Sequence, residues 1–134
     1  MGNQTSDIIS KNEYNLKIDS EYNFEVTTIK KGGLSLPKNI NLYLKDDRII
    51  LYKKRKKKII ILFQILYIQI IKWMASKNYW GFYAVIDNKL VKLKFHAFEK
   101  ANEISHKMLD RIYKFMETVD NDSYDSLYMN VVNQ

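Results

Sequence analysis

The sequence predicts a mainly β domain that ends in one long α-helix. Three observations lead to this prediction. Apolar and polar residues alternate through much of residues 22–95, as they do in strands with one buried face. From residue 97 onward the apolar residues recur every three or four positions, which is the helical period. The chain has 134 residues, 46% of them hydrophobic, which suffices for a single domain with one core.

The first three strands follow from alternation and turn signals. Residues 22–29 alternate, and the lysines and glycines of 30–33 then break the pattern. Residues 40–44 alternate again, the aspartates at 46–47 mark a turn, and residues 48–52 return as the second arm of a hairpin.

The rest of the sheet is expected between residues 53 and 95. The lysine-rich segment 53–58 is predicted to be a loop that leads into residues 59–73, which are rich in Ile, Leu, Phe and Tyr. About fifteen residues exceed the usual strand length, so we expect two strands with a bend near Gln64. After a loop at 74–78, the last strands are expected at 79–86 and 89–95, with Leu90, Lys92 and Lys94 on the more charged face of the final strand.

The helix is predicted over residues 97–119. Its apolar stripe lies opposite a charged face, on which Glu103–Lys107 and Asp110–Lys114 have the spacing of ion pairs. Such a helix covers an open corner of a strongly bent sheet, and this layout is that of a pleckstrin-homology-like (PH-like) barrel. The apolar stripe consists of Phe98, Ala101, Ile104, Ser105, Met108, Leu109, Ile112, Phe115, Met116 and Val119.

The predicted domain therefore spans residues 22–119. Residues 1–21 are polar and unpatterned, so we expect a flexible N-terminal arm. Residues 120–134 are expected to form a flexible acidic tail.

The positive charge is concentrated in one part of the chain. The net charge is +7, and residues 30–58 alone carry eleven basic residues against two acidic ones. Such an excess points to an anionic partner, either a membrane surface or a nucleic acid. The alternative interpretation of residues 53–58 is a solvated loop that only keeps the protein soluble.

Residue types that support catalysis or metal binding are few. The chain has no cysteine, which excludes disulfides, thiolate metal sites and a cysteine nucleophile. His96 and His106 lack a metal-ligand spacing, and there is no glycine-rich phosphate loop. We therefore expect no enzymatic activity, no catalytic residue, no cofactor and no metal site. We also expect no signal peptide, and the apolar run 59–71 is shorter than the ~20 residues of a membrane span.

The amino terminus matches the N-myristoylation pattern, with Gly2 after the initiator methionine and Ser6 at the required place. Myristate alone binds membranes weakly, so stable anchoring needs a second signal. Palmitate would need a cysteine, which leaves the basic residues as the second signal. With Gly2 as the acylation site, the predicted membrane-binding residues are Lys30, Lys31, Lys53, Lys54, Arg55, Lys56, Lys57 and Lys58.

These features together resemble a known family. Gly2 in an acylation context, a strand series with Trp73 and the run Tyr79-Trp80-Gly81-Phe82, and a terminal helix are similar to the inner membrane complex sub-compartment proteins of apicomplexan parasites. The resemblance implies a non-enzymatic, acylated protein with a PH-like fold on the cytoplasmic face of the inner membrane complex, at the cell cortex. Such proteins organise membrane sub-compartments and cell division through protein contacts.

Two segments of the sequence depart from the patterns of related proteins. Cysteines that usually follow the glycine are replaced by Asn3, Gln4 and Thr5. The second predicted strand, residues 39–44, lacks the Lys/Arg-x-Arg pattern of phosphoinositide-binding PH domains. We therefore expect electrostatic lipid binding with low head-group specificity.

Three other functions stay open at this point. One is an acylated PH-domain protein that senses phosphatidic acid or another anionic lipid, and another is a protein-interaction scaffold. The third is a small nucleic-acid-binding barrel, with Tyr52, Tyr67, Trp73, Trp80 and Phe82 as a stacking platform. Because these aromatic residues fall on strands whose apolar face must be filled, we expect them in the core and expect no nucleic-acid partner.

Overall fold

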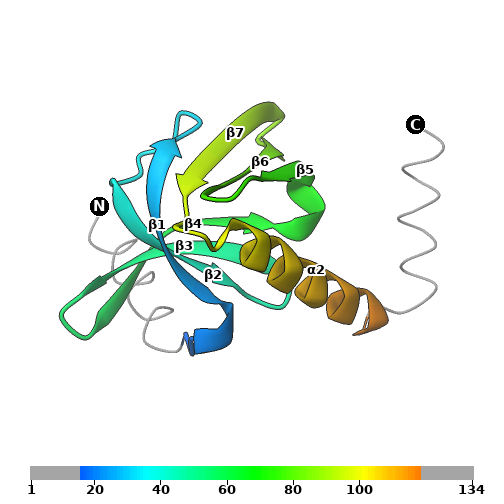
Figure 1. Cartoon of the computed structure of the whole chain (residues 1–134), viewed down its shortest axis with the longest axis horizontal. Helices are drawn as coiled ribbons and strands as arrows, with labels where there is room; N and C mark the ends of the chain where they lie inside the picture. Colours follow the sequence, from blue (N-terminus) through cyan, green and yellow to red (C-terminus); the bar gives the residue numbers. More distant parts are fainter. Residues whose placement is uncertain (1–15, 119–134) are drawn as a thin grey trace.

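The computed structural model describes residues 16–118. Within this range, seven antiparallel strands form one sheet of order β4-β3-β2-β1-β7-β6-β5, and one helix follows the last strand (Figure 1). This confirms the mainly β class with a C-terminal helix. The elements are η1 (Ser20–Tyr22), β1 (Asn23–Lys30), β2 (Asn39–Leu44), β3 (Arg48–Arg55), β4 (Lys58–Leu66), η2 (Tyr67–Gln69), β5 (Ile70–Ala75), β6 (Tyr79–Ile86), β7 (Lys89–His96) and α2 (Ala101–Thr118).

The sheet curls strongly but is not closed among the described residues. Strands β4 and β5 are its two edges, and they are joined through η2 rather than by a ladder of hydrogen bonds. In Figure 1 the sheet bends around a central space, and α2 lies across the open side. The helix contacts β2, β5 and β6, so it ties together strands from both halves of the sheet.

The core fills the concave side of this sheet. Trp80 and Phe82 of β6 and Phe95 of β7 are completely buried. From α2, only Ala101, Ile104 and Met108 are buried, which is one stripe of the helix. The Trp80 indole Nε1 donates a hydrogen bond to Ser105 Oγ at 3.0 Å, so the largest core side chain has its polar atom satisfied by the helix.

The β3–β4 hairpin is longer than predicted. The basic segment 53–58 is not a loop, because Lys53–Arg55 belong to β3 and Lys58 belongs to β4. Only residues 56–57 form the turn, and Lys56 has a left-handed φ of 59°. The isoleucines of β4 extend the ladder, since Lys53 pairs with Ile60 and Lys54 pairs with Ile59.

The predicted bend near Gln64 is also misplaced. Gln64 lies inside β4 and pairs with Ile50, whereas the chain turns three residues later at η2. A side chain closes this turn, because Gln69 Oε1 accepts a hydrogen bond from the Leu66 backbone N–H at 2.8 Å. The reversal thus depends on a local side-chain contact and not on apolar periodicity.

The helix begins four residues later than predicted. Residues 97–100 form a turn in which Glu99 has a φ of 60°. Asn78 holds this turn, because its carbonyl accepts from Ala97 N–H at 2.6 Å and its Oδ1 accepts from Glu99 N–H at 2.8 Å. Phe98, predicted on the apolar stripe, precedes the helix and is 79% exposed.

One of the two predicted helix ion pairs forms. Asp110 and Lys114 lie 3.3 Å apart, whereas Glu103 pairs with Lys100 at 3.5 Å instead of Lys107. Lys107 lies over the Tyr22 ring, with Nζ 5.1 Å from the centroid. The aromatic ring at the start of the domain has therefore replaced the acidic partner.

Residues 16–21, which the sequence assigns to the arm, contact the sheet and the helix. Leu16 and Ile18 pack against the core. The Tyr43 hydroxyl donates to the Lys17 carbonyl at 3.3 Å, and Arg111 of α2 lies 3.9 Å from the Asp19 carboxylate. The remainder of the predicted arm, including Gly2, and the predicted tail at 120–134 lie outside the described residues.

Candidate anion-binding surfaces

The basic tip, defined as residues 53–58, lies at the end of the β3–β4 hairpin. In Figure 1 this hairpin extends away from the rest of the sheet, at the lower left. Residues 54–58 are exposed and Lys53 is half-buried. Within residues 16–118, no carboxylate forms a salt bridge with any residue from Lys53 to Lys57. Their charges are therefore available to an anionic partner.

The root of the hairpin is braced at the opposite end from the tip. The Arg48 guanidinium donates two hydrogen bonds to the Asp47 carboxylate, both 2.9 Å long, and a third at 3.0 Å to Gln64 Oε1 on β4. The hydrogen bonds from Arg48 lower the pKa of Asp47 below its ordinary value. This contact joins β3 to β4 at the end of their ladder farthest from the tip.

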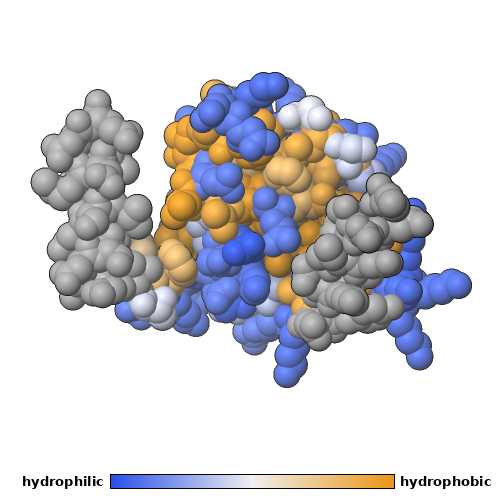
Figure 2. Space-filling model, turned by 180° about the vertical axis from the view of Figure 1, so that it is seen from behind, coloured by the Kyte–Doolittle hydropathy of each residue, from blue (hydrophilic) through white to orange (hydrophobic). Residues whose placement is uncertain are grey.

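The hairpin combines its charge with apolar surface. Along β4, residues 59–63 are hydrophobic and only half-buried. In the connection to β5 and in that strand, Ile68 and Ile71 are 74% and 62% exposed. The rear view in Figure 2 shows apolar residues gathered over a broad area of the surface, with long hydrophilic side chains projecting beyond it at the lower right. Lysines beside an apolar edge strand also oppose edge-to-edge pairing, which is a structural role for the same residues.

Lys30 and Lys31 lie beside β7 rather than beside the basic tip. Lys30 pairs with Lys94 in the β1–β7 ladder. Gly32, two residues after Lys30, has a φ of 60°. A Cβ at Gly32 would lie 2.3 Å from Val91 Cγ1 of β7. The loop after β1 therefore packs on β7, while β2 separates β1 from β3 in the sheet. The structure does not gather all the predicted membrane-binding lysines on one surface.

A second basic surface, which we call the β5–β7 face, emerges from strand register. Lys72, Tyr83 and Lys92 are neighbours across β5, β6 and β7. One row away, Gly81 and Lys94 are neighbours, and Lys94 continues the row to Lys30. Strands β5, β6 and β7 contain no acidic residue. The alternation in residues 89–95 indicated this charged face, but the places of Lys72 and Lys30 on it depend on the pairing of strands.

The proposed stacking aromatics are not a surface platform. Tyr52, Tyr67, Trp80 and Phe82 are each less than 8% exposed, and Trp73 packs partly buried against the core. This confirms their expected use as core residues. Stacking on nucleic-acid bases requires exposed ring faces, which the four buried side chains do not offer.

Residues 16–118 also bear on metal binding and on membrane spanning. In that part of the chain, no three His, Cys, Asp or Glu side chains are grouped closely enough to hold a metal ion. Its helices include none with the length and hydropathy needed to cross a bilayer. Comparison of the chain with protein-family models and with curated proteins finds no match.

Proposed function

We propose that the protein is a non-enzymatic peripheral membrane protein, myristoylated at Gly2, whose basic tip docks on an anionic membrane. The observation that carries the proposal is the tip itself. Six consecutive basic residues stand at the end of an extended hairpin, and Lys53 to Lys57 have no acidic partner within residues 16–118. Charge placed in this way reaches a flat surface before the body of the domain does.

The energies of the two signals are matched. A myristoyl chain alone gives reversible binding, with a partition constant of ~10⁴ M⁻¹. Each Lys or Arg close to an anionic leaflet adds about 1 kcal/mol at ordinary ionic strength. Six such residues contribute up to about 6 kcal/mol, less the part that salt screens. Neither signal alone gives a stable anchor, whereas the two together do.

We further propose that the domain is PH-like and serves as an adaptor that organises a cortical membrane sub-compartment through protein contacts. The strand order, with β1 joining a four-stranded and a three-stranded half, supports this fold, as does the position of α2 over the open side. The Gly2 motif supports the membrane part of the proposal. In this arrangement the tip faces lipid while the other surfaces of the domain remain free for proteins.

The basic tip is tested by charge reversal. In co-sedimentation with phosphatidylcholine–phosphatidylserine vesicles, the variant Lys54→Glu/Arg55→Glu/Lys57→Glu should lose most of its binding. A matched control changes the same net charge elsewhere, at the exposed residues Lys17, Lys38 and Lys89. The control should retain most of the binding, because screening limits charge effects to about 10 Å at 0.1 M salt. An equal loss in both variants would contradict docking through the tip.

The acyl anchor is tested separately. Intact mass of the protein purified from its own cells should show the added 14-carbon chain, and Gly2→Ala should release the protein from membranes. An unmodified amino terminus, or a Gly2→Ala variant that stays fully membrane-bound, would rule out the anchor and leave the tip to be judged by the vesicle experiment.

A further inference from the structure

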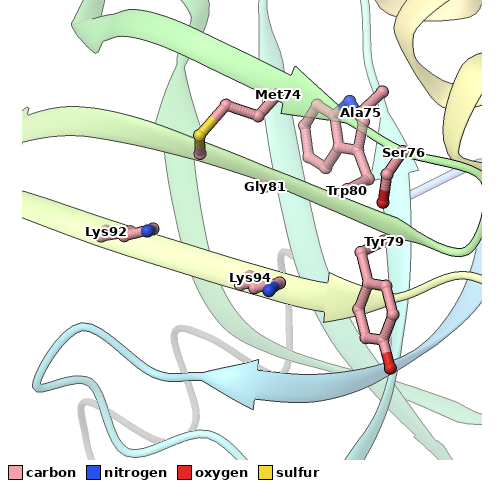
Figure 3. Close-up of a pocket in the computed structure, with 8 residues that line it drawn as sticks. All are labelled: Met74, Ala75, Ser76, Tyr79, Trp80, Gly81, Lys92 and Lys94. Atoms are coloured by element: carbon pink, nitrogen blue, oxygen red, sulfur yellow. The ribbon is translucent and has the colours of Figure 1, made fainter.

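A small hollow lies on the β5–β7 face, away from the basic tip (Figure 3). Its volume is about 190 Å³. Water occupies roughly 30 Å³ per molecule in the liquid, and pockets for drug-sized ligands have about 300–1,000 Å³. The hollow therefore suits a small group rather than a whole organic ligand. It is lined by Met74, Ala75, Ser76, Tyr79, Trp80, Gly81, Lys92 and Lys94.

The floor of the hollow is set by Gly81. A Cβ at this position would lie 2.6 Å from the carbonyl oxygen of Leu93, closer than real Cβ contacts allow. No side chain therefore projects between Tyr79 and Tyr83, the next residues of β6 on the same side. The missing side chain at Gly81 therefore contributes to the depression.

Two lysine side chains line this hollow. Lys94 Nζ lies 4.9 Å from the centroid of the Tyr79 ring, and Lys92 Nζ lies 5.2 Å from that of Tyr83. These cation–π contacts restrict both side chains before any ligand arrives, which reduces the entropy lost on binding. In Figure 3 both lysines project from the same side of β7.

The charge around the hollow is uncompensated along its strands. No acidic residue occurs in β5, β6 or β7, while Lys72 and Lys30 continue the two rows that contain Lys92 and Lys94. A concave site with charges of one sign raises the local concentration of counter-ions. Ser76 and Tyr79 are also among the residues that line it.

We infer that this hollow binds a phosphate group, with Lys92 and Lys94 as its cationic contacts. Lysine is a compact point charge that commonly binds phosphate, and a tetrahedral anion accepts donors from several directions. The phosphate can belong to a soluble compound or to a lipid headgroup, and the chemistry at the hollow is the same. The inference requires neither acylation at Gly2 nor docking through the basic tip.

The test is an NMR titration of the full chain with inorganic phosphate at constant ionic strength. Amide signals of residues 74–76, 79–81 and 92–94 should shift and reach saturation. In Lys92→Gln/Lys94→Gln the apparent Kd should rise roughly tenfold or more, the order expected from losing charged hydrogen-bond donors. The matched control Lys54→Gln/Lys57→Gln should keep the wild-type Kd. Dispersed spectra of both variants will show that they are folded.

Two outcomes would overturn the inference. One is a linear shift of similar size at every lysine-rich segment, which is an ionic effect only. The other is saturation at residues 53–58 with the β5–β7 face unchanged. Either result leaves the vesicle test of the basic tip unaffected.

Two further arms identify the source of the phosphate once the site is established. Glycerol 3-phosphate tests a soluble ligand. Vesicles that carry phosphatidylinositol 4-phosphate, compared with phosphatidylserine vesicles of equal charge, test a lipid headgroup. Saturable shifts in residues 92–94 with either probe support the site and assign its source, whereas an absence of shifts with both contradicts a phosphomonoester ligand.

Discussion

Because Gly81 has no Cβ, it leaves room for the hollow on the outer surface of β5, β6 and β7. Its neighbours across the sheet are Met74 and Lys94, and the Leu93 carbonyl oxygen lies 2.6 Å from the place that a Cβ would take. The sequence shows Gly81 as one of four glycines and as part of the run Tyr79-Trp80-Gly81-Phe82, with no sign of a packing role. The register of β6 on β7 is what turns that glycine into a packing requirement.

Replacing this glycine should destabilise the domain. For Gly81→Ala we expect a loss of about 1–3 kcal/mol in the free energy of unfolding, because the new methyl group forces β6 and β7 apart. Urea denaturation monitored by tryptophan fluorescence measures this. Ser76→Ala, at the rim of the hollow, is the control and should change stability by less than about 0.5 kcal/mol. An unfolding free energy of Gly81→Ala equal to that of the wild type would show that the strands accommodate a Cβ.

Asp110 is a second residue whose state depends on its neighbours. Its carboxylate accepts a hydrogen bond from the Tyr22 hydroxyl, which is the main cause that lowers the pKa of Asp110, and Lys114 adds to the effect. A lowered pKa means that the folded protein binds fewer protons than the unfolded chain. The contact therefore stabilises the fold above the ordinary pKa of 3.8, and this contribution is lost as the pH falls through the lowered value.

The Tyr22–Asp110 contact should be visible as acid sensitivity. Asp110→Asn should lower the urea midpoint at pH 7 and flatten the dependence of stability on pH below 4. Tyr22→Phe removes the hydroxyl donor and should reproduce much of the flattening. Lys114→Gln removes the smaller cause and should have the weaker effect. A pH profile of Asp110→Asn that parallels the wild type would contradict this assignment.

At the scale of elements, α2 shows which buried residues the helical period predicts and which it does not. The stripe with a period of 3.6 residues correctly identified Ala101, Ile104 and Met108 as the buried residues of the helix. It wrongly included Phe98, because the backbone of Glu99 turns into the left-handed region before the helix begins. It also included Met116, which is 39% exposed. The turn that delays the start of the helix is held by Asn78, whose Oδ1 accepts a hydrogen bond from Glu99 N–H. Because Asn78 is distant in sequence, the sequence of the helix itself does not reveal this contact.

The two faces of α2 should differ sharply in their effect on stability. Met108→Ala should cost about 2–5 kcal/mol, because it opens a cavity between the helix and the sheet. Tyr113 lies on the opposite face and is 63% exposed, so Tyr113→Ala should change stability by about 0.5 kcal/mol or less. Thermal and urea unfolding of both variants provide the comparison. Similar losses in the two would show that α2 does not close the core through Met108.

The β3–β4 hairpin shows that a run of charged residues predicts exposure to solvent but not the absence of secondary structure. A run of six basic residues predicts solvent exposure, and five of the six are exposed. It does not predict a loop, because strand pairing needs only backbone groups and the isoleucines of β4 provide the partner ladder. The basic residues therefore stand on an ordered support.

At the scale of the whole molecule, two basic surfaces divide the positive charge. The basic tip lies on β3–β4, and the β5–β7 face lies on the other half of the sheet. Lys30 belongs to the β5–β7 face because it pairs with Lys94 of β7. Net charge alone combines these surfaces into one number, +7. We expect their separation in space to appear as two separable binding activities.

Salt should weaken membrane binding in a way that depends on the acyl chain. The screening length is about 8 Å at 0.15 M salt and about 3 Å at 1 M. The unacylated chain should therefore leave phosphatidylserine vesicles as salt rises, whereas the myristoylated chain should keep the weak residual binding of its lipid. Co-sedimentation across a salt series measures both. Binding of the unacylated chain that is independent of salt would contradict an electrostatic contact.

The sequence by itself determined the mainly β class with a C-terminal helix, the order of the strands along the chain and the presence of a basic cluster. Those properties depend on local periodicity and composition, so they can be read from neighbouring residues. The tertiary structure decided the order of strands in the sheet, the pairing of Lys30 with Lys94, the ordered hairpin under residues 53–58 and the hollow above Gly81. Each of these depends on which distant strands pair and in which register, and register is fixed by long-range packing that no single segment encodes.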